Sequence, residues 1–207
     1  MVDIGANIGI YSYAFRSYCR EIHAFEPQSA CRAVLEAIRA PNIRLHSVAL
    51  SDTDETMDLR IPEKDGSRID GLASLRPLNG NVIIEKVSVT TLDSFGFTDI
   101  ALLKIDVEGH EMRVLKGALE TIRRERPVIL IEIEQRHITF PIQEYFTFFK
   151  NEGYSGGFLL KGIWHPLDRF SYKEHQKPFE EAMNAERYRR IIGSYVCNFI
   201  FTPEESR

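Results

Sequence analysis

Short apolar runs alternate with helical patterns over the first 150 residues of the chain. The runs are Val2–Ile4, Ile22–Phe25, Ile43–Leu50, Ile100–Val107 and Val128–Ile133. Continuous apolar runs of this kind predict strands that are buried on both faces of a sheet. Between them, apolar residues recur at helical spacing, which predicts intervening helices. Strands that alternate with helices indicate right-handed crossovers and a mainly parallel sheet.

Two parts of the chain depart from this alternation. Residues 53–92 contain TMDLRIP, then a stretch rich in glycine, serine and asparagine, then VIIEKVSVTTL. This pattern predicts a hairpin with a long loop, inserted between the third and fourth parallel strands. Near the end of the chain, residues 158–167 and 194–203 predict two strands that pair antiparallel at one sheet edge. A polar helical segment is expected between them, over residues 171–192.

Composition narrows the class of protein. With 207 residues, 43% of them hydrophobic and 27% charged, the chain is long enough for one domain with a core, and disorder is excluded. No apolar run approaches the roughly 20 residues of a membrane-spanning helix. The net charge of −4 argues against a dedicated nucleic-acid binder. The unclustered cysteines indicate reduced thiols in a cytoplasmic protein; they are Cys19, Cys31 and Cys197.

A glycine-containing turn follows the first predicted strand. It reads Asp3-Ile-Gly5-Ala-Asn7-Ile-Gly9 and leads into a predicted helix. Glycines at such a turn let the backbone approach a ligand and direct N–H groups at it. Glu26 ends the second predicted strand, the position that holds the ribose hydroxyls of nucleotide-like cofactors in this topology. The pattern therefore predicts a cofactor that carries a nucleoside.

Asp3 and Asn7 favour one cofactor over another. A dinucleotide would bring a pyrophosphate to the turn, where the Asp3 carboxylate would repel it. S-adenosylmethionine has no phosphate and carries an ammonium group that could donate a hydrogen bond to the Asp3 carboxylate. Asn7 also replaces the middle glycine of the dinucleotide motif. Ser51 and Asp52, after the third run, could contact the adenine edge, although a simple turn explains them equally well.

The segment LLKIDVEGHE holds the densest group of ionisable residues. Ligands of open α/β sheets bind beyond the carboxyl ends of the strands, so Asp106 and Glu108 are expected beside the reacting group. In one interpretation, His110 or Asp106 is the general base. In a second, Asp106 and Glu108, with Glu134, hold a divalent cation such as Mg²⁺. In a third, Glu108 and Glu111 only cap a helix N-terminus.

The chain resembles the FkbM-type S-adenosylmethionine-dependent methyltransferases between residues 2 and about 135. The motifs that carry the resemblance are VDIGANIGIYS, FEPQ, ALSD, TLDSF, LLKIDVEGHEMRVLKGA and RPVILIEIE, in that order. The resemblance implies an α/β class I methyltransferase fold, Rossmann-like, a three-layer sandwich around a mostly parallel seven-stranded sheet. The implied strand order is 3-2-1-4-5-7-6, with strand 7 antiparallel.

The same resemblance implies a function and a set of site residues. It implies methyl transfer to a hydroxyl of a sugar, glycolipid, polysaccharide or other natural product. The implied cofactor contacts are Asp3, Gly5, Asn7, Gly9, Glu26 and Asp52, and the implied reaction centre comprises Asp106, Glu108 and His110. Residues 1–207 are expected to form a single methyltransferase domain. Because the family has a longer first strand and preceding helices, this chain is expected to lack N-terminal elements.

Two other functions remain open at this point. One is an NAD(P)-dependent oxidoreductase on the same kind of sheet, and the other is an inactive methyltransferase relic. Residues 62–84 and 164–192 are expected to shape the acceptor pocket. The sequence leaves open the acceptor, the need for a metal, the identity of the base and the oligomeric state.

Overall fold

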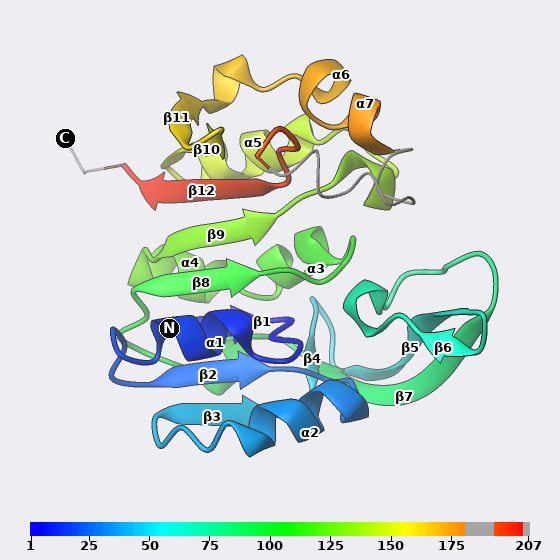
Figure 1. Cartoon of the computed structure of the whole chain (residues 1–207). Helices are drawn as coiled ribbons and strands as arrows, with labels where there is room; N and C mark the ends of the chain where they lie inside the picture. Colours follow the sequence, from blue (N-terminus) through cyan, green and yellow to red (C-terminus); the bar gives the residue numbers. More distant parts are fainter. Residues whose placement is uncertain (181–192, 205–207) are drawn as a thin grey trace. The chain divides into compact units, whose positions relative to one another are not determined.

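The computed structural model describes residues 1–180 and 193–204. The chain divides into two compact units, Met1–Pro127 and Val128–Arg207, and each is described by itself (Figure 1). Part of the helical segment expected over residues 171–192 forms two short helices. These are α6 (Tyr172–His175) and α7 (Lys177–Glu180). Residues 181–192 lie outside the described part of the chain.

The first unit is built on four parallel strands in the order β8-β1-β2-β3 (Figure 1). Their bounds are β1 (Val2–Ile4), β2 (Ile22–Phe25), β3 (Ile43–His46) and β8 (Leu102–Ile105). β1, β2 and β8 bury nearly every side chain, as expected for strands covered on both faces. The order confirms the first four places of the implied arrangement, 3-2-1-4.

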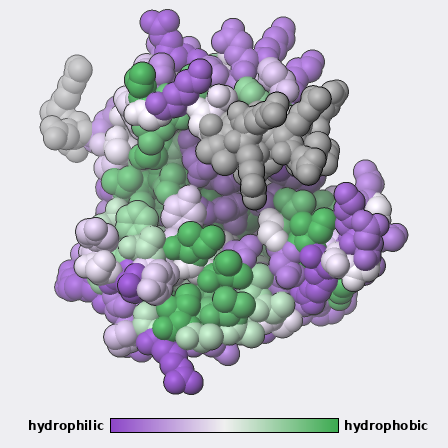
Figure 2. Space-filling model, viewed as in Figure 1, coloured by the Kyte–Doolittle hydropathy of each residue, from purple (hydrophilic) through white to green (hydrophobic). Residues whose placement is uncertain are grey.

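Helices connect and flank these strands. They are α1 (Ile10–Phe15), α2 (Ser29–Ala37), α3 (Glu111–Lys116) and α4 (Leu119–Glu125). Leu35 of α2 packs on Ala6 and Ala24 to form a small core beside β2. α1 and α2 carry exposed hydrophobic side chains, among them Ile10 and Val34. Hydrophobic residues also gather on the face of the molecule shown in Figure 2. Within the described residues, every helix is too short or too polar to cross a bilayer.

Residues 53–92 fold as a hairpin with its own small core. β5 (Glu55–Lys64) pairs antiparallel with β7 (Val82–Thr90), and β6 (Ser67–Arg68) extends the β5 edge. The apolar run 43–50 does not form one strand. The chain bends at residues 47 and 48, so β4 (Ala49–Leu50) leaves β3 and pairs with β7 instead. A 3₁₀ turn, η1 (Asp70–Leu72), follows β6.

The second unit contains four antiparallel strands in the order β9-β12-β10-β11. They are β9 (Val128–Glu132), β10 (Tyr154–Leu160), β11 (Ile163–Pro166) and β12 (Asn198–Pro203), and α5 (Gln143–Asn151) precedes β10. β9, β12 and β10 take the places of strands 5, 7 and 6 in the implied order, and β12 is antiparallel to both neighbours, as implied for strand 7. Packed aromatic rings, such as Phe149 on Phe201, fill the core of this unit.

The expectation of seven strands was wrong by one edge strand. Residues 158–167 were expected to form a single strand, but they fold back on themselves as β10 and β11. Lys161 and Gly162 both have positive φ, at 52° and 78°, which matches the tight turn that joins antiparallel strands. β11 is therefore an additional edge strand of the described residues.

Gly5 supplies a test of how closely the first unit is packed. Its φ is +74°, and an added Cβ would lie 1.8 Å from the carbonyl oxygen of Asp106. Gly66 has the same backbone strain, with φ +75°, but an added Cβ there meets no atom within 4 Å. We expect Gly66→Ala to lower the free energy of unfolding by about 1 kcal/mol and Gly5→Ala to lower it by about 3 kcal/mol or more.

Urea unfolding of the two variants measures this difference. Because the φ strain is shared, the extra loss in Gly5→Ala reports the backbone clash alone. Equal losses would show that β1 and the Asp106 carbonyl do not approach each other this closely.

Candidate functional site

A cleft opens in the first unit beyond the carboxyl ends of β1, β2 and β8. Its empty space is about 640 Å³, with the open mouth included. The walls come from the strand ends, from β4 and from η1 with the residues that follow it. Ligands of open α/β sheets bind at this edge, because the loops after the strands diverge there.

The cleft is acidic. Four acidic residues line it: Glu26, Asp70, Asp106 and Glu108. Among the described residues of its wall there is no lysine, arginine or histidine. The remaining wall is largely apolar and includes Pro27, Leu50 and Leu75. Such a cleft attracts cations and hydrogen-bond donors, and it opposes the binding of phosphates.

The glycine-containing turn after β1 lies only partly in the cleft. Gly5 and Asn7 line it, whereas Gly9 does not. Gly9 precedes α1 with φ +84°, and an added Cβ would lie 2.4 Å from a methyl of Leu35. Gly9 is therefore required for the packing of the turn on α2. The absence of a side chain at Gly5 likewise allows the close approach to the Asp106 carbonyl.

Glu26 is held at the cleft by two backbone N–H groups. Asn7 N donates to its Oε2 at 2.8 Å, and Gln28 N donates to its Oε1 at 2.7 Å. Burial raises the pKa of the Glu26 carboxyl, although these two hydrogen bonds oppose the shift. Each oxygen retains a lone pair, so the carboxylate can still accept from a ligand.

Asp3 lies behind the cleft wall and is 1% exposed. Ser12 Oγ donates to its Oδ2 at 2.6 Å, and its Oδ1 is buried with no hydrogen-bond partner among the described residues. Burial raises the pKa of Asp3, while the hydrogen bond from Ser12 and the nearby Lys104 lower it. Asp3 is therefore buried and does not line the cleft, although the sequence predicted that it would contact a ligand.

Asp106 forms an ion pair with Lys104 of β8. The side chain of Lys104 is 1% exposed, and its Nζ lies 3.0 Å from Asp106 Oδ2. The same ammonium lies over the ring of Tyr11, at 4.6 Å from its centroid. The buried Lys104 thus orients the side chain of Asp106, a residue that lines the cleft.

The loop after β8 is held in a strained shape. Glu108 has φ 51°, and its carbonyl oxygen accepts from Ser74 Oγ at 2.7 Å and from Arg76 Nε at 3.1 Å. Glu111 Oε1 accepts from the N–H groups of Gly109, at 2.9 Å, and Val107, at 3.3 Å. Burial raises the pKa of Glu111 to about 7. These contacts tie Glu111 to the loop that precedes α3 and do not cap the helix, whose N-terminus has no side-chain cap hydrogen bond.

His110 belongs to a polar chain outside the cleft. Its Nε2 lies 2.8 Å from Ser51 Oγ, and the Ser51 hydroxyl donates to Asp52 Oδ1 at 3.1 Å. Because a hydroxyl has one proton, His110 is then the donor from Nε2. Arg113 Nε donates to the same Asp52 oxygen at 2.6 Å. Neither His110 nor Ser51 nor Asp52 lines the cleft.

Burial and Arg113 together set the ionisation of His110 and Asp52. Burial lowers the pKa of His110 to about 4, and the guanidinium of Arg113 acts in the same direction. Burial opposes the ionisation of Asp52, yet the hydrogen bond from Arg113 holds its pKa below the usual range. His110 is therefore neutral and Asp52 is ionised near pH 7.

The insertion contributes residues that the sequence did not assign to this site. Asp70, Gly71 and Ala73 to Leu75 line the same cleft as Glu26. Sequence reasoning missed them because a loop rich in glycine and serine has no periodic pattern. The loop contains an acidic residue between two glycines, but nothing in the sequence places it against the turn after β1.

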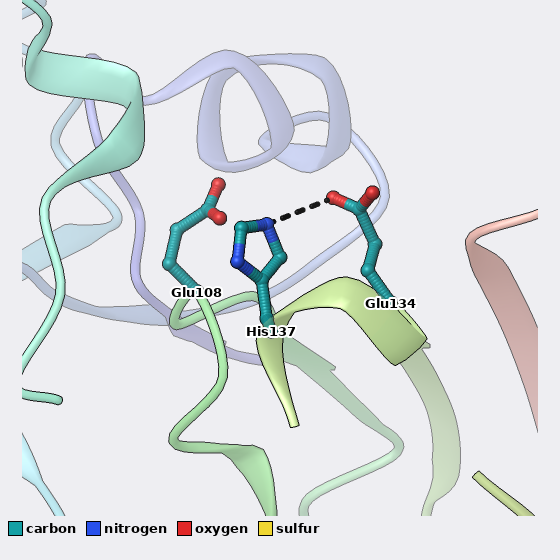
Figure 3. Close-up of side chains that lie close together, drawn as sticks. All are labelled: Glu108, Glu134 and His137. Atoms are coloured by element: carbon teal, nitrogen blue, oxygen red, sulfur yellow. Dashed lines mark ion pairs between the residues drawn. The ribbon is translucent and has the colours of Figure 1, made fainter. Parts of the chain in front are cut away.

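In the second unit, Glu134 has donors on both carboxylate oxygens. Arg136 donates to them at 2.7 and 2.9 Å, and Tyr195 donates to Oε2. His137 Nε2 lies 3.5 Å from Oε1 (Figure 3). Burial opposes its ionisation, but these groups together lower its pKa to about 2. Glu108, also drawn in Figure 3, belongs to the first unit. Glu134 thus has its acceptor positions filled within its own unit.

Comparisons with known proteins identify the family. The profile of the methyltransferase FkbM domain matches residues 3–155. A crystal structure of methyltransferase FkbM from Methylobacillus flagellatus KT superposes with a TM-score of 0.58 at 16% identity. The match covers 97% of this chain and 42% of that protein, so the chain spans less than half of its relative. A search of curated proteins finds no significant match.

Two more distant structures share a general resemblance. An rRNA methylase from Streptococcus thermophilus has a TM-score of 0.45 at 9% identity, covering 99% of this chain and 86% of that one. The YcgJ protein from Bacillus subtilis has a TM-score of 0.47 at 13% identity, covering 99% and 92%. The profile match extends over most of the chain, and it includes the turn after β1, the β2 end and the acidic loop after β8. The chain belongs to the FkbM methyltransferase domain family.

Proposed function

We propose that this chain is an S-adenosylmethionine-dependent O-methyltransferase. Its acceptor is a hydroxyl of a sugar, glycolipid, polysaccharide or other natural product. The observation that carries the proposal is the charge of the cleft, which has four acidic residues and no basic residue among the described residues of its wall. S-adenosylmethionine bears a net positive charge, whereas NAD(P) brings a pyrophosphate that these carboxylates would repel.

The groups of the cleft match the parts of this cofactor. Glu26, at the end of β2, is suited to accept the ribose hydroxyls. The apolar wall that includes Pro27 and Leu50 suits an adenine ring. Asp106 is suited to the ammonium, and it replaces Asp3 in that role because Asp3 lies behind the wall.

The cofactor supplies an activated methyl group, so the protein needs to align the acceptor and remove a proton. Asp106 and Glu108 line the cleft, and we assign Glu108 as the proton acceptor and Asp106 as the group that orients the cofactor. Alignment is worth on the order of 7–11 kcal/mol, and a placed base about 10²–10⁴-fold in rate. His110 lies outside the cleft, so we assign it to holding Ser51 and the Asp52–Arg113 pair.

Two further points belong to the proposal. Lys104 already neutralises one oxygen of Asp106, so a divalent cation would have to bind the other oxygen together with Glu108. The three cysteines are free thiols, which supports a cytoplasmic location. The acceptor class rests on the family resemblance.

Calorimetric titration with S-adenosylhomocysteine and with NADH tests the function. We expect micromolar binding of S-adenosylhomocysteine and no measurable binding of NADH. Binding of NADH alone would replace the proposal with an oxidoreductase. Folded protein that binds neither ligand would indicate a relic. Repeating the titration with Mg²⁺ and with EDTA shows whether a cation takes part.

Glu26→Gln tests the ribose contact through its dependence on pH. The ionised carboxylate is the stronger acceptor, so the substitution should weaken S-adenosylhomocysteine binding about tenfold or more at pH 7.5. Because burial raises the pKa of Glu26, the wild-type carboxyl gains its proton at a higher pH than an exposed glutamate. Wild-type affinity should therefore fall as the pH is lowered toward that raised pKa, and the variant should show a weaker fall.

Glu36→Gln is the matched control for this experiment. Glu36 is exposed on α2 and does not line the cleft, so its affinity and pH profile should equal those of the wild type. A pH profile in Glu26→Gln as steep as that of the wild type would remove Glu26 from the site.

His110→Gln tests the structural role assigned to His110. The folded-state pKa of about 4 lies below the usual 6.5, so the unfolded chain binds a proton first as the pH falls. Stability is therefore complete above pH 6.5 and is lost between pH 6.5 and 4. From pH 7 to pH 5, the variant should lose about 2 kcal/mol less unfolding free energy than the wild type.

Urea unfolding at the two pH values measures this difference. His165→Gln, on β11 of the second unit, serves as the control substitution. S-adenosylhomocysteine affinity should stay unchanged in His110→Gln. A large loss of affinity would place His110 in the cleft after all.

A further inference from the structure

The insertion forms one wall of the cleft. It stands at the carboxyl ends of β1, β2 and β8 (Figure 1). η1 and the residues after it line the same cleft as Glu26 and the turn after β1. Gly71 lies over that turn, since a Cβ added to it would be 3.9 Å from Asn7 Nδ2. The segment therefore reaches the end of the cleft at which Glu26 is placed.

A network of hydrogen bonds holds Asp70 in this wall. Arg68 Nε donates to Asp70 Oδ1 at 3.0 Å, and Gln28 Nε2 donates to the same oxygen. Arg68 also donates to Glu85 Oε1 at 2.9 Å, and Glu85 in turn accepts from the N–H and the hydroxyl of Ser29. The network ties the insertion to the start of α2, immediately after the β2 end.

Asp70 keeps one carboxylate oxygen for a ligand. Its side chain is 39% exposed, and its Oδ2 accepts no hydrogen bond from the described residues. Gln28 connects Asp70 to Glu26, because Gln28 N donates to Glu26 Oε1. Adenosine offers four donor hydrogens, on its amino group and its two ribose hydroxyls, whereas Glu26 has about two lone pairs left because each of its oxygens already accepts a backbone N–H. A second carboxylate near Glu26 would provide the further hydrogen-bond acceptors that adenosine needs.

We propose that Asp70 binds the adenosine half of the cofactor through its Oδ2, and that Arg68 is the residue that positions it. The inference rests on the proposed function, since it assumes that the cleft holds S-adenosylmethionine. It assigns residues 70–75 of the insertion to the cofactor, whereas the sequence assigned the whole of residues 62–84 to the acceptor. Specificity for adenosine then depends on the insertion as well as on the parallel strands.

Titration with two ligands tests the assignment. S-adenosylhomocysteine contains the adenosine and the amino acid, whereas 5′-methylthioadenosine lacks the amino acid. Asp70→Asn should weaken the binding of both ligands by the same factor, about tenfold. Asp65→Asn is the matched control, because Asp65 is exposed in the same hairpin, outside the cleft, and its binding should equal that of the wild type.

Arg68→Gln separates positioning from binding. It should weaken both ligands less than Asp70→Asn does, and the double variant should bind as Asp70→Asn does, since Arg68 acts through Asp70. A purely structural effect would instead add to that of Asp70→Asn. Thermal unfolding of each variant shows that the fold is retained.

The outcomes distinguish this inference from the proposed function. Wild-type protein that binds neither ligand contradicts both. Wild-type binding that Asp70→Asn leaves unchanged, or that Asp65→Asn weakens equally, overturns the role of Asp70 alone. A loss for S-adenosylhomocysteine but not for 5′-methylthioadenosine would place Asp70 at the amino-acid half and overturn the adenosine assignment.

Discussion

The close approach of β1 to the β8 end is the constraint on which the cleft depends. Asp106 N donates to the carbonyl of Ile4 at 3.0 Å, which continues the parallel ladder one residue past β8. At Gly5, the residue after β1, there is no room for a Cβ, so only glycine allows the backbone to pass this close to the Asp106 carbonyl. The glycine is thus needed to bring Asp106 and the turn after β1 to the same end of the sheet. Burial of both strands on both faces holds this geometry rigid.

The charged residues at the cleft are arranged with a buried lysine below and acidic residues at the surface. Lys104 is buried beneath the cleft, where it pairs with Asp106 and lies near Asp3. The cleft surface itself carries carboxylates alone among its charged groups in the described wall. A buried cation below an acidic surface orients the carboxylates without cancelling their attraction for a positively charged ligand. The pairing also explains why a lysine is tolerated inside an apolar strand.

The insertion contacts the cleft, α2 and the loop after β8. Its hairpin packs around its own apolar core. From that base, η1 reaches the cleft, and the Arg68 network ties it to α2. Ser74 and Arg76 hold the carbonyl of Glu108, so the same segment also fixes the acidic loop after β8. One inserted hairpin therefore contacts both ends of the proposed cofactor site.

The sequence by itself determined the parallel strands, their order in the first unit and the family. Strands buried on both faces leave continuous apolar runs, and residues that end such strands, such as Glu26 and Asp106, must meet at one edge. The tertiary structure alone decided which polar residues face the cleft. Asp3 and His110 do not line the cleft and contact Ser12 and Ser51, whereas Asp70 lines it from a loop without a pattern. Packing determines which side chains distant in the sequence contact each other, and the local hydrophobic pattern does not predict those contacts.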